Sequence, residues 1–246
     1  MQTQSCVSFS EKLLNHTRLT SDEQCALHKL TGERVVLPAH TDMVRRGQVV
    51  ESACLVVEGL LARTCNTASG FRQVTAFYVA GEMPDVHALM MPHATATLTA
   101  LSRAQVIRLP RNAVRDTVRH FPAIMEAFWR ETVIDAAIST QWVTNIGQRE
   151  AKARIAHLLA EMAVRRRAVI ANTFDFSFPA TQIDLADATG LSPVHVNRSL
   201  QALRAEQVMD VGKGRVYVRD WQKLVAVAEF DDRYLFFGNE PQRLLT

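Results

Sequence analysis

The chain has 246 residues, of which 48% are hydrophobic and 22% are charged, and its formal net charge is +3. These values are ordinary for a globular protein with one large or two medium domains. No apolar run approaches the roughly 18 residues that a membrane span needs, and the first residues lack the basic start and apolar core of a signal peptide. The sequence therefore predicts a cytoplasmic protein and excludes a membrane partner.

The four cysteines, Cys6, Cys25, Cys54 and Cys65, are widely scattered. They form neither a C-x-x-C pair nor the tight cluster that a zinc or iron–sulfur site uses. We expect free thiols and no metal site. Cys54 and Cys65 lie in strand-like sequence and are interpreted as small core residues.

The first half of the chain changes texture near Gly32. Two short helices are expected at residues 10–19 and 21–30. After them come short β-rich runs broken by glycine at nearly regular intervals, at residues 35–38, 42–47, 54–63, 74–82, 95–101 and 104–109. Such a pattern predicts an antiparallel β-roll, jelly-roll-like, and makes the fold class α+β. No helical period competes with this interpretation before residue 110.

A short helix is expected at residues 110–119, and a much longer one begins at Phe121-Pro122. Its apolar and small residues recur in alternating steps of four and three, at Met125, Trp129, Thr132, Ala136, Ser139, Val143 and Ile146. Phe128, Val133 and Thr140 widen this stripe. A heptad seam is typical of a helix that lies along a partner helix, so we expect a symmetric parallel homodimer. The alternative is burial of the stripe inside one chain.

Gly147-Gln148-Arg149 interrupts the seam, and the break near Asn145 to Arg149 predicts a hinge, after which residues 151–167 form a further helix. The expected domains are therefore a sensor domain at residues 1–119, a dimerisation helix with its hinge at 120–147, and a DNA-binding domain with a C-terminal extension at 148–246. The apolar extension from Trp221 onward is expected to pack back on its own domain or on a neighbour.

Residues 181–206 contain the start and stop residues of two short helices joined by a tight turn. Thr181 with Asp184 is close to a capping box, and Gly190 suits a left-handed helix end. Ser192-Pro193 then restarts the chain as N-cap and first helical residue. This is the helix-turn-helix arrangement, whose second helix enters the DNA major groove.

The second helix buries Val196, Leu200 and Leu203 by its spacing, and a larger apolar residue would be expected at Ser199. Val194, His195, Asn197, Arg198 and Gln201 point outward. Two alternating runs around Gly212-Lys213-Gly214 then predict a β-hairpin wing, whose Lys213 and Arg215 suit phosphate contacts. The segment from Ser192 to Arg219 contains five basic and two acidic residues, so its surface is expected to be locally basic.

In this order, the Gly-punctuated β-roll, heptad helix, A-x-x-R-I-A-x-L-L helix and winged helix-turn-helix resemble the Crp/Fnr family of bacterial transcription regulators. The resemblance covers all but about the last 25 residues, and LADATGLSPVHVNRSLQALR is its most specific part. It implies a homodimer that binds a palindromic promoter site and contacts RNA polymerase, with DNA affinity set by a signal at the N-terminal domain.

Matched residue by residue, Arg198 falls where the family places an arginine against DNA, and Thr181 and Ser192 fall on backbone-contacting positions. Val194 stands where most members have a glutamate, and Pro193 where the cyclic-AMP-binding members have an arginine. We therefore expect His195 and Asn197 to read sequence as well, since asparagine can pair with adenine. The complete expected DNA-contacting set is Thr181, Gln182, Ser192, Val194, His195, Asn197, Arg198, Gln201, Lys213 and Arg215.

The family's cyclic-nucleotide site uses Gly-Glu and then Arg-Ser. Gly81 and Glu82 are present, but residues 83–99 contain no arginine or lysine, and Ala94-Thr95 stand near the Arg-Ser position. A phosphate without a cation loses its main charge-assisted contact, which argues against cyclic AMP. Two polar residues of the long helix do match those that touch the base. The candidate ligand residues are Gly81, Glu82, Thr95, Ser139 and Thr140.

The sequence predicts no cofactor. Cys6 and Cys25 cannot supply the cysteine cluster of an iron–sulfur sensor, whereas His87 and His93 leave haem binding open. No G-x-S-x-G, H-E-x-x-H or P-loop motif supports an enzyme. The alternative to a DNA-binding regulator is a small-effector-binding signalling module that acts through protein contacts without specific DNA binding.

Overall fold

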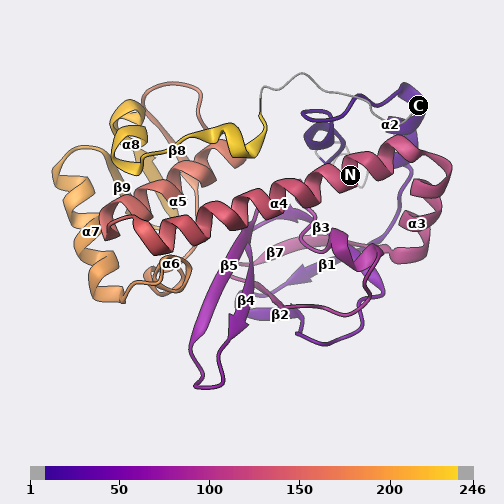
Figure 1. The fold of residues 1–246 in the computed structure, drawn as a ribbon, viewed down its shortest axis with the longest axis horizontal. Coiled ribbons are helices and arrows are strands. Elements are labelled where there is room, and N and C mark those ends of the chain that lie inside the picture. The colour runs from indigo at the N-terminus through magenta and orange to yellow at the C-terminus, as the bar shows by residue number, and fades with distance from the viewer. Residues whose placement is uncertain (1–8, 238–246) are drawn as a thin grey trace. The chain divides into compact units, whose positions relative to one another are not determined.

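A computed structural model describes residues 9–237 (Figure 1). Its contacts divide the chain into two compact units. Of the described residues, the β-roll unit holds residues 9–63, 77–137 and 236–237. The winged unit holds residues 64–76 and 138–235. The long helix therefore contributes to both units, and the hairpin of residues 64–76 belongs to the winged unit.

The β-roll unit is built on two antiparallel sheets. One has the strand order β1-β7-β3 and the other β2-β6-β4-β5. The strands are β1 Glu33–Leu37, β2 Thr41–Val44, β3 Ser52–Glu58, β4 Leu61–Asn66, β5 Arg72–Tyr78, β6 Thr97–Ala100 and β7 Ala104–Pro110. Residues 53–56 of β3 are all buried, and so are Val106, Ile107 and Leu109 of β7, so both faces of this sheet are covered. The predicted antiparallel β-roll and the α+β class are confirmed.

Short helices flank these sheets: α2 Ser21–His28, the 3₁₀ helix η1 Val86–Leu89 and α3 Arg111–His120. Thr20 and Glu23 form a complete capping box at the start of α2. The helix expected at residues 10–19 is shorter, with helical backbone only at residues 9–13. Phe9 and Leu13 are buried in one cluster with Ile124 and Phe128 of the long helix. The N-terminal helix is thus part of the β-roll core.

The long helix, α4 Pro122–Gln148, is continuous for 27 residues. It passes through Gly147 and ends at Gln148, within the range of the predicted break, so the interruption falls at Arg149 and Glu150. The spacing placed Phe128 beside the exposed seam, but this prediction is wrong. Phe128 is 1% exposed and lies in the β-roll core. The described residues include no helix long and apolar enough to cross a membrane.

The winged unit combines helices with one small sheet. Its elements are α5 Ala151–Arg165, β8 Phe174–Ser177, α6 Gln182–Thr189, α7 Pro193–Ala205, β9 Met209–Gly212, β10 Arg215–Val218, α8 Trp221–Ala228 and η2 Asp232–Leu235. The sheet order is β8-β10-β9. Strand β8 was not predicted, because residues 168–177 were interpreted as a connection. Phe174 and Phe176 are buried while Asp175 and Ser177 are exposed, the two-residue alternation that could have identified it.

The C-terminal extension packs on the winged unit as far as Leu235, whereas Phe236 and Phe237 belong to the β-roll unit, where the ring of Phe237 lies 5.9 Å from that of His16. Leu224 and Leu235 are buried, and the hydroxyl of Tyr234 donates to Glu161 Oε2 at 2.9 Å. The indole of Trp142, on α4, donates to the same oxygen at 3.0 Å. Arg165 donates to Oε1 at 2.8 Å. One buried carboxylate therefore joins α4, α5 and the extension.

Candidate DNA interface and effector pocket

The helix-turn-helix has the caps that its sequence indicates. Thr181 accepts from the backbone N–H of Asp184, whose carboxylate accepts from Thr181 N at 2.9 Å. Gly190 ends α6 with φ of 64°, which a residue with a Cβ would adopt only with strain. Ser192 caps α7 by accepting from His195 N at 3.3 Å. The turn angle between the two helices is thus set by local hydrogen bonds.

One face of α7 is buried and the other is free. Val196 and Leu203 are fully buried, and Ser199 is 7% exposed, so a small residue fills the position where a larger one was expected. Leu200 is only half-buried. All of the predicted DNA-contacting residues are exposed: Thr181, Gln182, Ser192, Val194, His195, Asn197, Arg198, Gln201, Lys213 and Arg215.

Three contacts order this exposed face. Asn197 Nδ2 donates to Gln182 Oε1 at 3.4 Å, which brings the start of α6 to the reading face of α7. Ser192 Oγ lies 2.9 Å from His195 Nδ1. Among the described residues, Arg198 has no hydrogen-bond or ion-pair partner. Its guanidinium is therefore available for an external acceptor such as a base edge.

The wing is a two-residue β-hairpin. Gly212 pairs with Arg215, and the intervening Lys213 and Gly214 have φ of 53° and 71°. Positive φ at both positions is the geometry of the turn that matches the twist of paired strands. Lys213 is exposed at the tip, whereas Arg215 is bound to the carboxylate of Asp175 on β8. Arg215 can contact a phosphate only if it shares or leaves that partner.

A second set of contacts in the winged unit involves residues that the sequence did not single out. Arg72, at the start of β5, donates to Asp184 at 2.8 Å and to Asp187 at 2.6 Å. Gln73 donates to the carbonyl of Asp187. Asp184 and Asp187 were interpreted as capping and solvated residues. Asp184 does cap α6, but both carboxylates also hold the hairpin, a contact across 112 and 115 residues that no local pattern signals.

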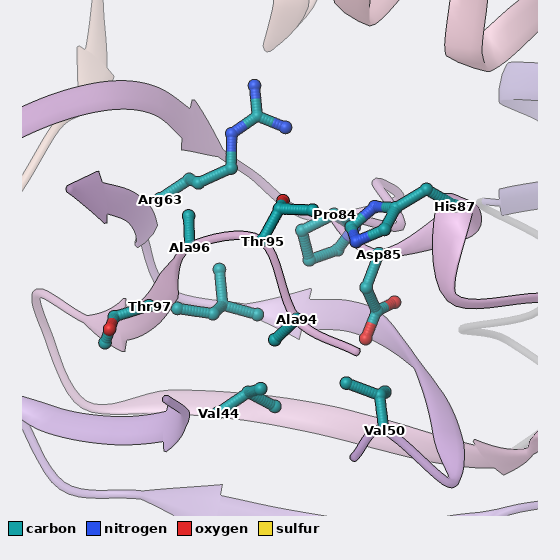
Figure 2. Close-up of a pocket in the computed structure, with 11 residues that line it drawn as sticks. Val44, Val50, Arg63, Pro84, Asp85, His87, Ala94, Thr95, Ala96 and Thr97 are labelled. Carbon is teal, nitrogen blue, oxygen red and sulfur yellow. The ribbon is translucent and has the colours of Figure 1, made fainter. Parts of the chain in front are cut away.

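The β-roll unit contains a cavity of about 20 Å³, room for a single water molecule. Figure 2 shows its lining, with Asp85 and His87 at one end and Val44 and Val50 below. Thr95, a predicted ligand residue, is among the lining residues. A nucleotide would not fit this volume without movement of the walls.

The other predicted ligand residues do not line this cavity. Glu82 is buried, accepts from Val79 N at 2.9 Å and is paired with Lys12, so its carboxylate is already engaged. Gly81 precedes it in the same turn. Ser139 and Thr140 lie on α4 in the winged unit.

The cavity does have a cation in its wall, at the end of the predicted β-rich run 54–63, although this residue was not expected to be a ligand residue. Arg63 on β4 lines it, but its guanidinium donates to Asp135 at 2.8 Å and lies 5.7 Å from the ring centre of Tyr78. In Figure 2 this guanidinium is directed away from Val44 and Val50. The positive charge of Arg63 is therefore already paired with the carboxylate of Asp135.

Two further titratable groups of the cavity, Asp85 and His87, have pKa values that burial shifts toward the neutral form. Burial raises the pKa of Asp85 to about 7, against the opposing hydrogen bond from Cys54 N at 2.8 Å. Burial, together with the charge of Arg63, lowers the pKa of His87. Asp85 Oδ2 and His87 Nε2 have no hydrogen-bond partner among the described residues. Such a lining suits a hydrogen-bonding ligand better than a phosphate.

Metal ligands do not cluster in the part of the chain that the structure describes. No group of three or more histidine, cysteine, aspartate or glutamate side chains could hold an ion there. Cys25 is exposed, Cys54 is buried and Cys65 is half-buried, all as free thiols, while Cys6 lies outside the described residues.

A β-roll joined by a long helix to a winged helix-turn-helix with an open recognition helix defines a DNA-binding protein with a ligand-binding-type domain. Residues 153–227 match the family description "Crp-like helix-turn-helix domain", and residues 34–121 match "Cyclic nucleotide-binding domain". The chain belongs to the Crp/Fnr family of transcription regulators. Members of this family are generally not enzymes.

Individual relatives agree with this assignment. The transcriptional activator protein FnrL of Cereibacter sphaeroides is 23% identical over 219 residues, 87% of each chain. The fumarate and nitrate reduction regulatory protein of Vibrio cholerae is 18% identical over 226 residues, 92% of this chain and 87% of that one. The structure of FixK2 from Bradyrhizobium japonicum has a TM-score of 0.73 at 20% identity, covering 80% of this chain and 98% of that chain.

Proposed function

We propose that the chain acts as a homodimer that binds a palindromic promoter site, with α7 of each subunit in the major groove of one half-site. The observation that carries this proposal is the reading face of α7. His195, Asn197 and Arg198 are exposed on it, beside a fully buried opposite face. Arginine suits guanine and asparagine suits adenine in the major groove, so these residues support sequence-specific reading.

The dimer is supported by the exposed side of α4. Met125, Trp129 and Val143 of the predicted seam are 36%, 69% and 73% exposed in one chain. Val133, beside the seam, is 49% exposed. Large apolar side chains in a continuous stripe along a helix mark an interface, and a second copy of the same helix covers such a heptad stripe symmetrically. Family resemblance adds contact with RNA polymerase to the proposal.

The regulatory signal is proposed to act through the β-roll unit. Cyclic AMP does not suit this unit as the effector ligand. The cavity has room for only one water molecule, Glu82 is engaged by Lys12, and the carboxyl of Asp85 is part of the lining. An anion brought next to that carboxyl would oppose its ionisation and gain no free cation in return. A small hydrogen-bonding effector accords better with this lining.

The test is a mobility-shift titration against a duplex selected from a random-sequence pool. Arg198→Ala should lower specific affinity by about 10- to 100-fold, corresponding to the loss of one base contact, and should relax selectivity at one base pair. Binding should also weaken steeply with salt.

Arg119→Ala is the matched control, because Arg119 is an exposed arginine on α3 of the β-roll unit. It should bind as the wild type does. If the wild-type protein selects no duplex even at low salt, the signalling module without DNA binding becomes the better interpretation.

A further inference from the structure

A second and larger cavity lies entirely within the winged unit. Its volume is about 310 Å³, and it is lined by Gln141 of α4, by Arg149 between α4 and α5, and by Glu229, Asp231, Arg233 and Tyr234 of the extension after α8. The matched helix-turn-helix description ends at residue 227, so four of these six residues lie beyond it. The volume falls at the lower end of the range of small-molecule sites.

Arg149 is the chemically unusual group in this wall. Its side chain is 11% exposed, and its Nε and Nη1 have no hydrogen-bond partner among the described residues. Nη2 donates to the carbonyl of Glu229 at 3.5 Å, the long limit for such a bond. A buried N–H group of a charged side chain that makes no hydrogen bond destabilises the fold, so such a group in a folded protein calls for an explanation.

The surrounding groups do not neutralise this cation. Asp231 is held by Arg233, and the hydroxyl of Tyr234 donates to Glu161. The ring of His157 stacks on Tyr234, and burial together with the charge of Arg149 lowers the pKa of His157 to about 3, so the imidazole is neutral. Glu229 approaches to 3.7 Å, but its side chain is 72% exposed and its charge is screened by water.

We propose that this cavity binds a small organic acid, and that the guanidinium of Arg149, whose Nε and Nη1 are closed to solvent in this structure, turns toward the cavity so that the carboxylate of the acid accepts their hydrogen bonds. Guanidinium and carboxylate groups match in shape as well as charge, and a partly desolvated pair is stronger than an exposed one. Gln141 and Arg233 offer further donors to the rest of the ligand.

The position of the site gives it a regulatory consequence. Arg149 stands where α4 has ended and α5 has not begun, and the opposite wall belongs to the extension that packs on α5. A ligand that contacts both walls would favour one orientation of α5 relative to the end of α4. The site is separate from the β-roll cavity, so the protein would receive two signals.

The test uses the full-length protein and calorimetric titration with acetate, succinate and L-glutamate, each at millimolar concentrations. We expect saturable binding of at least one of these acids. Succinamide, which has the shape of succinate without its charge, should not bind. Arg149→Gln should weaken binding about tenfold or more, as expected for one charge-assisted contact.

Lys152→Gln is the control, because Lys152 is a nearby exposed cation outside the lining, paired with Glu206. It should bind the acid as the wild type does. Circular dichroism checks that each variant is folded. If Arg149→Gln does not fold, Gln141→Leu and Arg149→Lys replace it and should each reduce affinity.

Three results would overturn the proposal: no saturable binding of any of the three acids, equal binding of succinamide, or unchanged binding by the folded Arg149 variants. None of these results bears on recognition of DNA by α7, which the mobility-shift titration tests by itself.

Discussion

The carboxyl group of Asp85 is held between the backbone of β3 and the cavity of the β-roll unit. Its Oδ1 accepts from Cys54 N, and burial raises its pKa from 3.8 to about 7. Between these values the folded chain holds a proton that the unfolded chain has released. Stability from this group is therefore fully present below about pH 4 and is lost as pH rises towards and past 7.

We predict that Asp85→Asn makes the protein less sensitive to pH in this window. Asparagine keeps an acceptor for Cys54 N and cannot ionise. The wild type should lose stability between about pH 5 and pH 8, and the variant should lose less, by up to roughly 3 kcal/mol, because only the part of the shift above pH 5 lies in this window. Urea unfolding at both pH values measures the difference.

Asp116→Asn, at an exposed acid of α3, is the control for this experiment and should keep the wild-type pH dependence. An equal pH dependence in Asp85→Asn and wild type would show that Asp85 is ionised at little cost in the folded state.

Single residues were also where the sequence was least informative. Arg63 and Arg72 look alike in sequence, as polar members of neighbouring strands. The first binds Asp135, and the second binds Asp184 and Asp187. These partners are 72 to 115 residues away. Only the folded chain brings them together, so periodicity could not reveal either contact.

Among the elements, α4 has two faces of opposite character. Ile124, Phe128 and Trp142 are buried on one, while the seam with Trp129 and Val143 is exposed on the other. An α-helix of 27 residues is about 40 Å long, enough for a long symmetric contact. In a single chain these large apolar side chains of α4 would remain exposed to water, which supports the proposal that a second subunit covers them.

We predict that Val143→Glu weakens the homodimer by at least about tenfold. In a symmetric parallel pair the same position of each subunit meets across the axis, so the change places two like charges in an apolar contact. Sedimentation equilibrium over a range of concentrations gives the dissociation constant.

Gln148→Glu adds the same charge at an exposed position outside the seam and should leave the dimer unchanged. A wild-type protein that sediments as a monomer at micromolar concentration would contradict the proposed dimer, whatever the variants do.

Helices whose ends carry capping residues were predicted from the sequence, whereas strand β8, whose only signal is its alternation of buried and exposed residues, was missed. Thr181, Gly190 and Ser192 mark the ends of α6 and α7, and the structure places the caps there. Strand β8 has only four residues and no turn signal of its own, and it is stabilised by pairing with β10. The exposed reading face of α7 followed from its spacing, whereas the cavity at Arg149 depends on an extension whose packing the sequence left open.

At the scale of the whole molecule, the hairpin between β4 and β5 is the element that connects distant parts of the sequence. Its residues 64–76 group with the winged unit, and Arg72 binds the two acids of α6. Asp184 has a side chain that is only 3% exposed, so removal of Arg72 would leave a buried carboxylate with fewer partners.

We predict that Arg72→Ala destabilises α6 by about 1 to 3 kcal/mol, the usual range for hydrogen bonds to a charged group. Hydrogen exchange should become faster at the amides of residues 185–189 and stay unchanged in α8. Arg72→Lys keeps the charge and should be milder. Unaltered exchange in α6 of the alanine variant would show that the hairpin contact contributes nothing to its stability.

The shared oxygen of Glu161 makes the segment after α8 important for a helix nearly a hundred residues earlier. A premature stop codon after residue 228 would spare each residue expected to touch DNA, yet it would remove Tyr234 and leave the carboxylate to Trp142 and Arg165 alone. The codons of residues 229–235 therefore help to encode the seating of the long helix.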